Sequence, residues 1–193
     1  AGGIDVLSDN GLISFDSLSV RTEAAPGGFA FDVFGEGADY QGGEITVSAL
    51  AGGSISGRNL TLRSNATGVD GSGGDGTGGN ITVLADDASI ALTGTLSANA
   101  TGRGGSGIGT NAGVEPGTGQ GGIVRFIVRG AAGEMDLARV FATSDGSIFQ
   151  DVEVGFGDAE GNGGSGIAGS VIFDIEAGIF SAEGVSVSAD GIG

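Results

Sequence analysis

The sequence predicts an all-β protein, a right-handed parallel β-solenoid of about five coils with variable Gly-rich loops. Short alternating apolar runs, rich in β-branched residues, indicate strands rather than helices. The same run also recurs, each time after two glycines, in "YQGGEITV" (40–47), "GTGGNITV" (76–83) and "GQGGIVRF" (119–126). A strand that pairs with its equivalent one turn later must restart at the same angular position, so this recurrence predicts stacked coils.

Five repeat units follow from this alignment, and together they predict a single β-solenoid repeat domain over residues 1–193. The units start near residues 4, 45, 81, 124 and 171, at steps of 41, 36, 43 and 47 residues. Each unit continues with a turn, an apolar pivot and a second alternating run; the pivots are Ile13, Ile55, Ile90, Met135 and Ile179. We expect two inward-facing columns, one of Ile4, Ile45, Ile81, Val124 and Val171, the other of Val20, Leu62, Leu96, Ala142 and Val187.

A column of polar residues is predicted where the second run of each unit ends. Its members are Glu23, Asn65, Asn99, Asp145 and Asp190. The distance from the unit start to this ladder is 18 to 21 residues, whereas the distance from the ladder to the next start is 16 to 26 residues. Near-constant length indicates a coil held in register, and variable length indicates a loop. Asn and Asp suit such corners because their side chains hydrogen-bond to nearby backbone.

The composition excludes several classes of function. The chain has 44 glycines, no Cys, no His and no Lys, and its formal net charge is −17. Imidazole bases, thiol nucleophiles and His/Cys metal sites are therefore absent, which favours a non-enzymatic role. The negative charge argues against nucleic acid or an anionic membrane as a partner. No apolar run approaches the roughly 20 residues that span a bilayer, so we expect no membrane insertion.

The repeat cadence resembles that of a known family. The order "GG-x-I-T-V … G-S-I … L-T-L … N-A-T-G … G-x-G-G" across the chain is similar to the Gly-rich repeats of filamentous-haemagglutinin-like adhesins, the β-helical exoproteins that bacteria export by two-partner or autotransporter routes. This resemblance implies an extracellular, cell-surface fibre that serves in adhesion or matrix building, with a cell-surface or glycan receptor. It implies no catalytic residue.

Calcium is a candidate cofactor at two places. Asp70 and Asp75 lie in "DGSGGDGTGGN", which loosely resembles a calcium-binding Gly-rich repeat; a solvated loop is the alternative interpretation. Asp145 and Asp190 belong to consecutive units, so stacking brings their carboxylates to about 5 Å, where they repel unless a cation, a proton or solvent separates them.

Two enzymatic alternatives remain open. Asp86 and Asp87 form an acidic pair that suits half of a glycosidase dyad, or a solvated turn. Tyr40 with the arginines suits a polysaccharide lyase. A carbohydrate-binding module and a calcium-stabilised matrix protein are further alternatives. Four N-x-T sequons, at Asn59, Asn65, Asn80 and Asn99, are interpreted as strand and corner residues rather than glycan acceptors.

The ends of the stack predict the partner. The sequence starts "AGGIDV" without Met, which suggests a mature or excised piece, and neither end shows a capping helix. Uncapped end coils expose unpaired backbone and invite stacking. We therefore expect the partner to be a second copy, joined head to tail or laterally, or flanking repeats of a longer chain.

Overall fold

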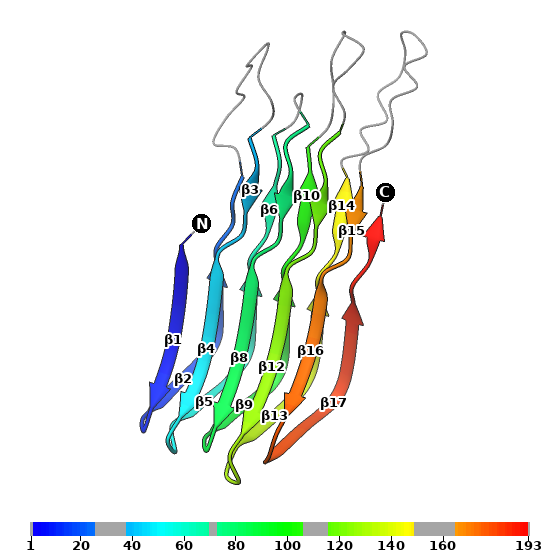
Figure 1. Ribbon diagram of the computed structural model, residues 1–193. Coiled ribbons are helices and arrows are strands. Elements are labelled where there is room, and N and C mark those ends of the chain that lie inside the picture. Colours follow the sequence, from blue (N-terminus) through cyan, green and yellow to red (C-terminus); the bar gives the residue numbers. More distant parts are fainter. Residues whose placement is uncertain (1, 26–37, 70–72, 106–115, 149–164, 193) are drawn as a thin grey trace, which may run out of the picture.

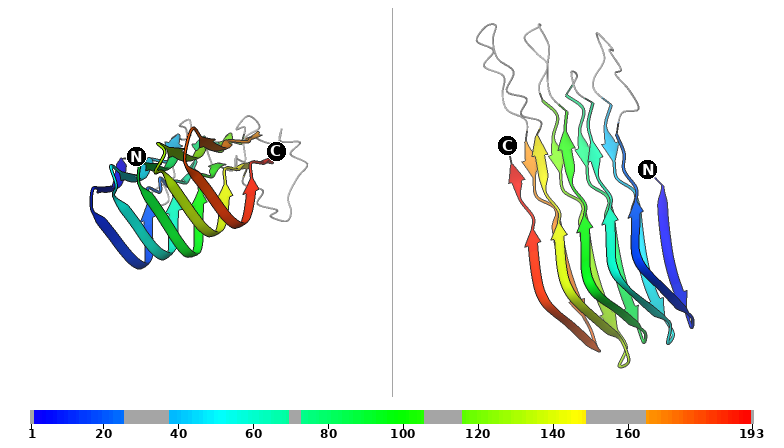
Figure 2. Two further views of the ribbon diagram at one scale, coloured as in Figure 1. Left: turned by 90° about the horizontal axis from the view of Figure 1, so that it is seen from below. Right: turned by 180° about the vertical axis from the view of Figure 1, so that it is seen from behind.

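The computed structural model describes residues 2–25, 38–69, 73–105, 116–148 and 165–192. Within these ranges the chain forms strands and no helix, and therefore no helix long and apolar enough to cross a membrane. The strands pair in parallel and stack in four sheets, with equivalent strands of successive units side by side (Figures 1 and 2). This arrangement confirms the predicted all-β class and is compatible with a β-solenoid.

One five-stranded sheet contains the first long strand of every unit. Its members, in spatial order, are β1 (Gly3–Asp9), β4 (Glu44–Leu50), β8 (Asn80–Asp86), β12 (Ile123–Arg129) and β16 (Ser170–Ile175). The pairing places one residue of each strand in a single column across the sheet. These residues are Ile4, Ile45, Ile81, Val124 and Val171. The first predicted column is thus confirmed.

A second five-stranded sheet contains the second long strand of every unit. Its members are β2 (Leu12–Arg21), β5 (Ser54–Arg63), β9 (Ser89–Asn99), β13 (Glu134–Thr143) and β17 (Ile179–Ser188). Two predictions for this sheet are wrong. Ala98, not Leu96, lies between Leu62 and Ala142, and the pivot of the last unit is Phe180, which pairs with Met135, not Ile179.

The misplacement of Leu96 has a local cause. The register shifts between Gly57 and Leu60 in one pairing of β9 and between Leu137 and Arg139 in the other. Strand β9 has 11 residues where its neighbours have 10, so it contains a bulge. Beyond the bulge Leu96 belongs to the column of Leu60 and Val140, and the small Ala98 takes the next inward position.

The core lies between the two five-stranded sheets. Alternate residues of β4, β8 and β12 are buried against alternate residues of β5, β9 and β13. Phe126 is fully buried, and its ring stacks on Phe173 of the next unit at a centroid distance of 4.9 Å, while Phe173 meets Phe180 edge to face. Like residues therefore stack along columns, as the alternation predicts.

Two further sheets are built from the Gly-rich segments that the sequence predicts as loops. One contains β6 (Ala66–Thr67), β10 (Gly102–Gly104), β14 (Gly146–Ile148) and β18 (Gly191–Ile192); the other contains β3 (Tyr40–Gln41), β7 (Gly76–Thr77), β11 (Gly119–Gln120) and β15 (Gly166–Ile167). These sheets pack backbone against backbone. A Cβ atom at Gly102 would clash with the carbonyl oxygens of Gln120 and Gly76. The described parts of these segments are therefore paired strands, not free loops.

The recurrent glycine pair lies at a crowded corner before β4, β8 and β12. A Cβ atom at Gly79 would clash with the carbonyl oxygen of Gly43, and one at Gly122 with that of Gly79. The fully buried hydroxyls of Ser64 and Ser144 complete this corner by donating hydrogen bonds of 2.6 Å to the carbonyl oxygens of Gly43 and Gly122. Only glycine allows such close approach of successive backbones, which explains the recurrence of "GG" before β4, β8 and β12.

Candidate functional site

The polar ladder lies where the second long strands end and the short strands begin. Backbone hydrogen bonds join Ala24 N–H to Asn65 C=O, Ala66 N–H to Thr101 C=O, Gly102 N–H to Asp145 C=O, and Gly146 N–H to Asp190 C=O. This pairing sets Glu23, Asn65, Thr101, Asp145 and Asp190 in one column. The prediction of Asn99 for this position is wrong, because Asn99 pairs with Arg63 and Thr143 inside the sheet.

Asp145 and Asp190 contact each other through hydrogen bonds at the C-terminal end of this ladder. The Oδ1 atom of Asp145 accepts a hydrogen bond of 2.9 Å from the backbone N–H of Asp190. The Ser188 hydroxyl lies 2.7 Å from the same Oδ1 atom and 3.0 Å from Oδ2 of Asp190. The hydroxyl has a single proton, so it donates to one carboxylate at a time. These bonds hold one carboxylate over the next unit.

The other calcium candidates are only partly described. Asp70 lies outside the described residues. The Oδ1 atom of Asp75 accepts a hydrogen bond of 2.6 Å from Thr118 N–H, and the N–H of Asp75 donates to Oδ1 of Asp39 at 2.9 Å. Among the residues that the structure describes, no three acidic side chains converge on a point where they could hold a metal ion. Calcium therefore stays a prediction from the sequence.

Asn and Asp side chains serve a common structural purpose across the stack. In six cases Oδ1 of one unit accepts a hydrogen bond from a backbone N–H of the next unit. The acceptors are Asp39, Asn59, Asn65, Asp75, Asp87 and Asp145, and their donors are the N–H groups of Asp75, Thr95, Thr101, Thr118, Ala132 and Asp190. The sequence predicts such bonds only for the ladder. The others depend on register, which the sequence signals only weakly.

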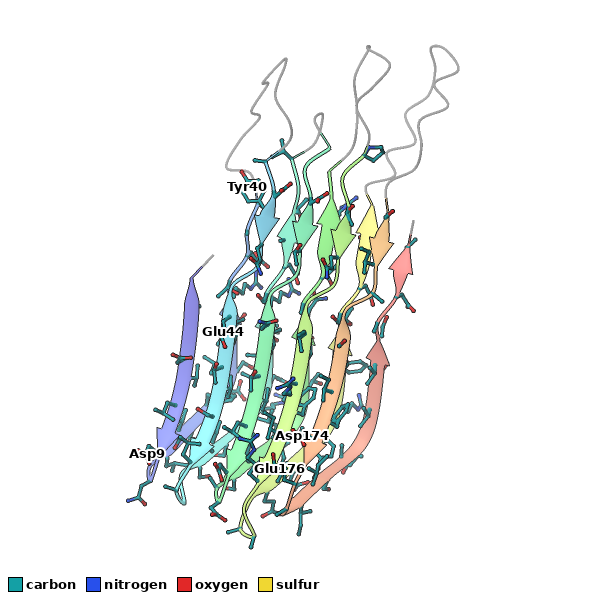
Figure 3. All side chains as sticks on the ribbon, viewed as in Figure 1. Asp9, Tyr40, Glu44, Asp174 and Glu176 are labelled. Carbon is teal, nitrogen blue, oxygen red and sulfur yellow. The ribbon has the colours of Figure 1, made fainter. Side chains whose placement is uncertain are left out.

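The enzymatic candidates are spread over different parts of the fold. Asp87 occupies the turn after β8 with a φ of 44°, and its Oδ1 atom binds Ala132 N–H. Asp86 lies in register with Leu50 and Arg129. Tyr40 is half-buried in β3, at the opposite end of the strands from Asp9 and Glu176 (Figure 3). The structure therefore does not bring Tyr40 to the acidic pair.

The sequon asparagines and the arginines complete the sequence candidates. Asn59, Asn65 and Asn99 all accept backbone hydrogen bonds through Oδ1, and Asn80 is exposed at the start of β8. Arg129 forms an ion pair of 3.0 Å with Glu176 of the next unit, with both side chains about half exposed. Arg21 and Arg63 lie opposite each other in β2 and β5.

The two end edges of the stack form the most extended candidate binding surface. Strands β1 and β2 form the edge at the N-terminal end, and β16 and β17 form the edge at the C-terminal end (Figures 1 and 2). Side chains that are buried in the middle units are exposed here. Leu96 and Val140 are at most 1% exposed, whereas Val185, in the same column, is 50% exposed.

Comparison of the chain with protein-family models, with curated proteins and with solved structures found no match. Function must therefore be inferred from the geometry of the stack and from the repeat pattern.

Proposed function

We propose that the chain is a non-enzymatic structural or adhesive module of an extracellular fibre. In this proposal residues 1–193 form one domain, a right-handed parallel β-solenoid of about five coils, whose partner is a further stack of the same kind. Secretion to the cell surface agrees with the acidic composition.

The observation that carries the proposal is the continuous parallel pairing of both five-stranded sheets. Apart from the bulge in β9, each unit pairs with the next in continuous register, and among the described residues the outermost strand at each end has a sheet neighbour on one side only. An exposed edge of parallel strands is a template for another strand. A stack with equivalent but opposite ends associates head to tail, and this kind of contact generates open filaments rather than closed rings.

The resemblance to filamentous-haemagglutinin-like adhesins supports the same proposal. The glycine pairs that carry the resemblance lie at crowded corners where a Cβ atom would meet carbonyl oxygens of the preceding unit. A repeat that contributes such corners is suited to a long stack. In this proposal the chain is a member of this family, is exported by its route and binds a cell-surface receptor.

Labelling of intact cells tests the cellular part of this proposal. An antibody raised against the purified chain should bind unpermeabilised source cells, and immunogold electron microscopy should place the label on extended surface fibres. A cytoplasmic label that appears only after permeabilisation would reject the proposal. Cryo-electron microscopy of the fibres would also report the handedness and the number of coils for each copy.

A second candidate function is glycan binding, and one observation favours it. A depression along β13 and β17 is lined by Arg139, Phe141, Glu183 and Val185, among others. Phe141 is 46% exposed there, although aromatic side chains are usually buried. An exposed ring beside charged hydrogen-bonding groups suits a sugar. Phe141→Ala should then lower binding to a glycan array about tenfold, the size of effect expected for one binding contact, while the fold is unchanged.

A further inference from the structure

The two ends of the stack present matching columns of side chains. Register through the second sheet places Leu12, Ser54, Ser89, Glu134 and Ile179 in one column. Both end members are large apolar residues that are exposed, Leu12 by 70% and Ile179 by 61%, whereas the three middle members are polar. An apolar residue at each end of an otherwise polar column is what a contact between these two ends needs.

The inward columns match in the same way. If the register continued from one copy to the next, Val185 would stack on Leu18 and Val187 on Val20. Val185 and Val187 are 50% and 48% exposed in the single chain. Their equivalents in the middle units are buried, so stacking would remove apolar surface from water at both ends.

The outward columns oppose this contact. Asp9 heads the column that ends with Glu176. Phe15 and Ala182 belong to one column. Asp16 and Glu183 come directly after them, so these two acidic residues also occupy equivalent positions at the two ends. Glu23 heads the ladder that ends with Asp190. Continued register would therefore place three acidic residues of one copy against three of the next.

We propose that the edge formed by β16 and β17 binds β1 and β2 of a second copy in continued register, that the repulsion within three stacked carboxylate pairs weakens this contact at neutral pH, and that protonation of these carboxylates in acid strengthens it. The proposal rests on the self-association in the proposed function and adds its register and its pH dependence. Strands in register lie about 4.8 Å apart, so each pair would lie within strong repulsion distance.

Neighbouring charges reduce this repulsion without removing it. Arg129 is paired with Glu176, and Arg139 lines the same depression as Glu183. Arg58 lies beside Asp16 in the adjacent strand, because Phe15 pairs with Gly57. Arg63 lies opposite Arg21. Asp145 lies beside Asp190 and adds negative charge. Of the arginines, only Arg21 belongs to the contact itself, where it would face Ser188. The other acidic residues of the end strands, Asp5 and Asp174, would face Ile172 and Leu7.

Acidic pairs within the single chain show how the fold accommodates such neighbours. Among the described residues, adjacent acidic side chains occur at Asp39 with Asp75 and at Asp145 with Asp190, and in both cases a backbone N–H of one residue donates to the carboxylate of the other. Three more such pairs at one contact concentrate negative charge. Protons neutralise it, and an association that takes up protons strengthens as the pH falls.

Sedimentation velocity of the purified chain tests the proposal. At neutral pH and low salt the chain should be monomeric. It should associate near pH 4.5, where carboxylates begin to bind protons, and also at neutral pH when salt of about 0.5 M screens the charges. The triple variant Asp9→Asn, Asp16→Asn, Glu23→Gln should associate at neutral pH at least about tenfold more tightly than the wild type. Electron microscopy should show linear particles.

Two matched variants separate charge at the contact from charge elsewhere on the chain. Glu44→Gln, Asp86→Asn and Asp136→Asn change the net charge equally but lie in β4, β8 and β13, so this triple variant should behave as the wild type. Ile179→Asn changes an exposed residue and should weaken association in acid. Equal gains from both triple variants would overturn the proposal in favour of a net-charge effect.

The remaining outcomes separate this proposal from the proposed function. Association that does not depend on pH would reject the proposed weakening of the contact by the three carboxylate pairs and would leave the fibre proposal standing. No association under any condition, even by the Asp9, Asp16 and Glu23 variant, would reject the second copy as occupant. In that case cell-surface labelling still decides the proposed function independently.

Discussion

The carboxylate of Asp145 accepts a hydrogen bond of 2.9 Å from the backbone N–H of Asp190, the equivalent residue of the next unit. The Ser188 hydroxyl lies within hydrogen-bonding distance of both carboxylates. The hydrogen bonds from Asp190 N–H and from the Ser188 hydroxyl thus offset the predicted repulsion between the two carboxylates.

Asp145→Asn separates hydrogen bonding from charge. The amide oxygen of Asn keeps the ability to accept from Asp190 N–H and Ser188, while the like-charge repulsion disappears. We expect the free energy of unfolding to rise by about 0.5 kcal/mol at neutral pH, the order of one exposed charge interaction. Thermal melts with and without EDTA measure it. A wild-type melting temperature that falls in EDTA, together with a variant that does not respond, would instead establish calcium at this pair.

Two substitutions at the buried serine position of the glycine corners should change the free energy of unfolding in opposite directions. Ser144→Ala removes a hydrogen bond of 2.6 Å to Gly122 C=O from a fully buried site and should cost about 1 kcal/mol. In the third unit the equivalent residue is Ala100, which is also fully buried. Ala100→Ser should regain the missing bond to Gly79 C=O and stabilise by up to about 1 kcal/mol. Urea denaturation of both variants measures the two changes; destabilisation by Ala100→Ser would show that this corner is tighter than its neighbours.

Much of the long-strand arrangement could be predicted because large β-branched residues alternate in every unit. The prediction failed where side chains are small. Ala98 is small and gives a weak apolar signal, so the repeated "NATG" motif suggested that Asn99 matches Asn65, whereas the register beyond the bulge in β9 pairs Asn65 with Thr101. The short glycine strands show no alternation at all, because their pairing involves backbone alone.

The candidate site was predictable to a similar extent. Corner Asx residues such as Asn65 and Asp145 follow a strand at constant spacing, so their column could be expected. The backbone partners of Asn59 and Asp87 lie in the next unit, at positions fixed by register and turn geometry. No local sequence signal identifies them. The exposed pair Leu12 and Ile179 was missed because nothing in the sequence relates the two end units to each other.

The glycine pairs predict an asymmetric response to alanine. Gly122→Ala places a methyl group against the Gly79 carbonyl oxygen, in backbone that cannot yield, and should destabilise by about 3 kcal/mol or more. Gly184→Ala is the matched control, because nothing lies within 4 Å of a Cβ atom there. Chemical denaturation should show a loss confined to Gly122→Ala. Similar losses from both would mean that crowding against the preceding unit does not explain the loss at Gly122.

The turn between the two long strands predicts a stabilising substitution. Asn10, Ala51, Asp87 and Gly130 occupy equivalent positions, and all have positive φ, between 44° and 72°. Gly tolerates this conformation because it has no Cβ atom, and Asn or Asp compensates for it by hydrogen-bonding locally. Ala51 is the only member of this set that can do neither. Ala51→Gly should therefore raise the free energy of unfolding by about 0.5 to 1 kcal/mol, as judged by urea denaturation. A loss of stability would show that Ala51 gains more from reduced chain entropy than it loses in strain.

Hydrogen exchange should reveal a gradient of local stability along the stack. Strand β9 is paired on both sides, and its Leu96 is fully buried; β17 is paired on one side, and its Val185 is 50% exposed. Because an edge strand opens without disturbing the rest, we expect amides of β17 to exchange at least about tenfold faster than those of β9 at neutral pH and low protein concentration. Mass spectrometry of peptides from the two strands measures this ratio. In the Asp9, Asp16 and Glu23 triple variant at high concentration, a second copy should cover the edge and slow exchange in β17 and β2 together, with little change in β9. Protection that rises in β9 alone would place the contact between copies on another face of the stack.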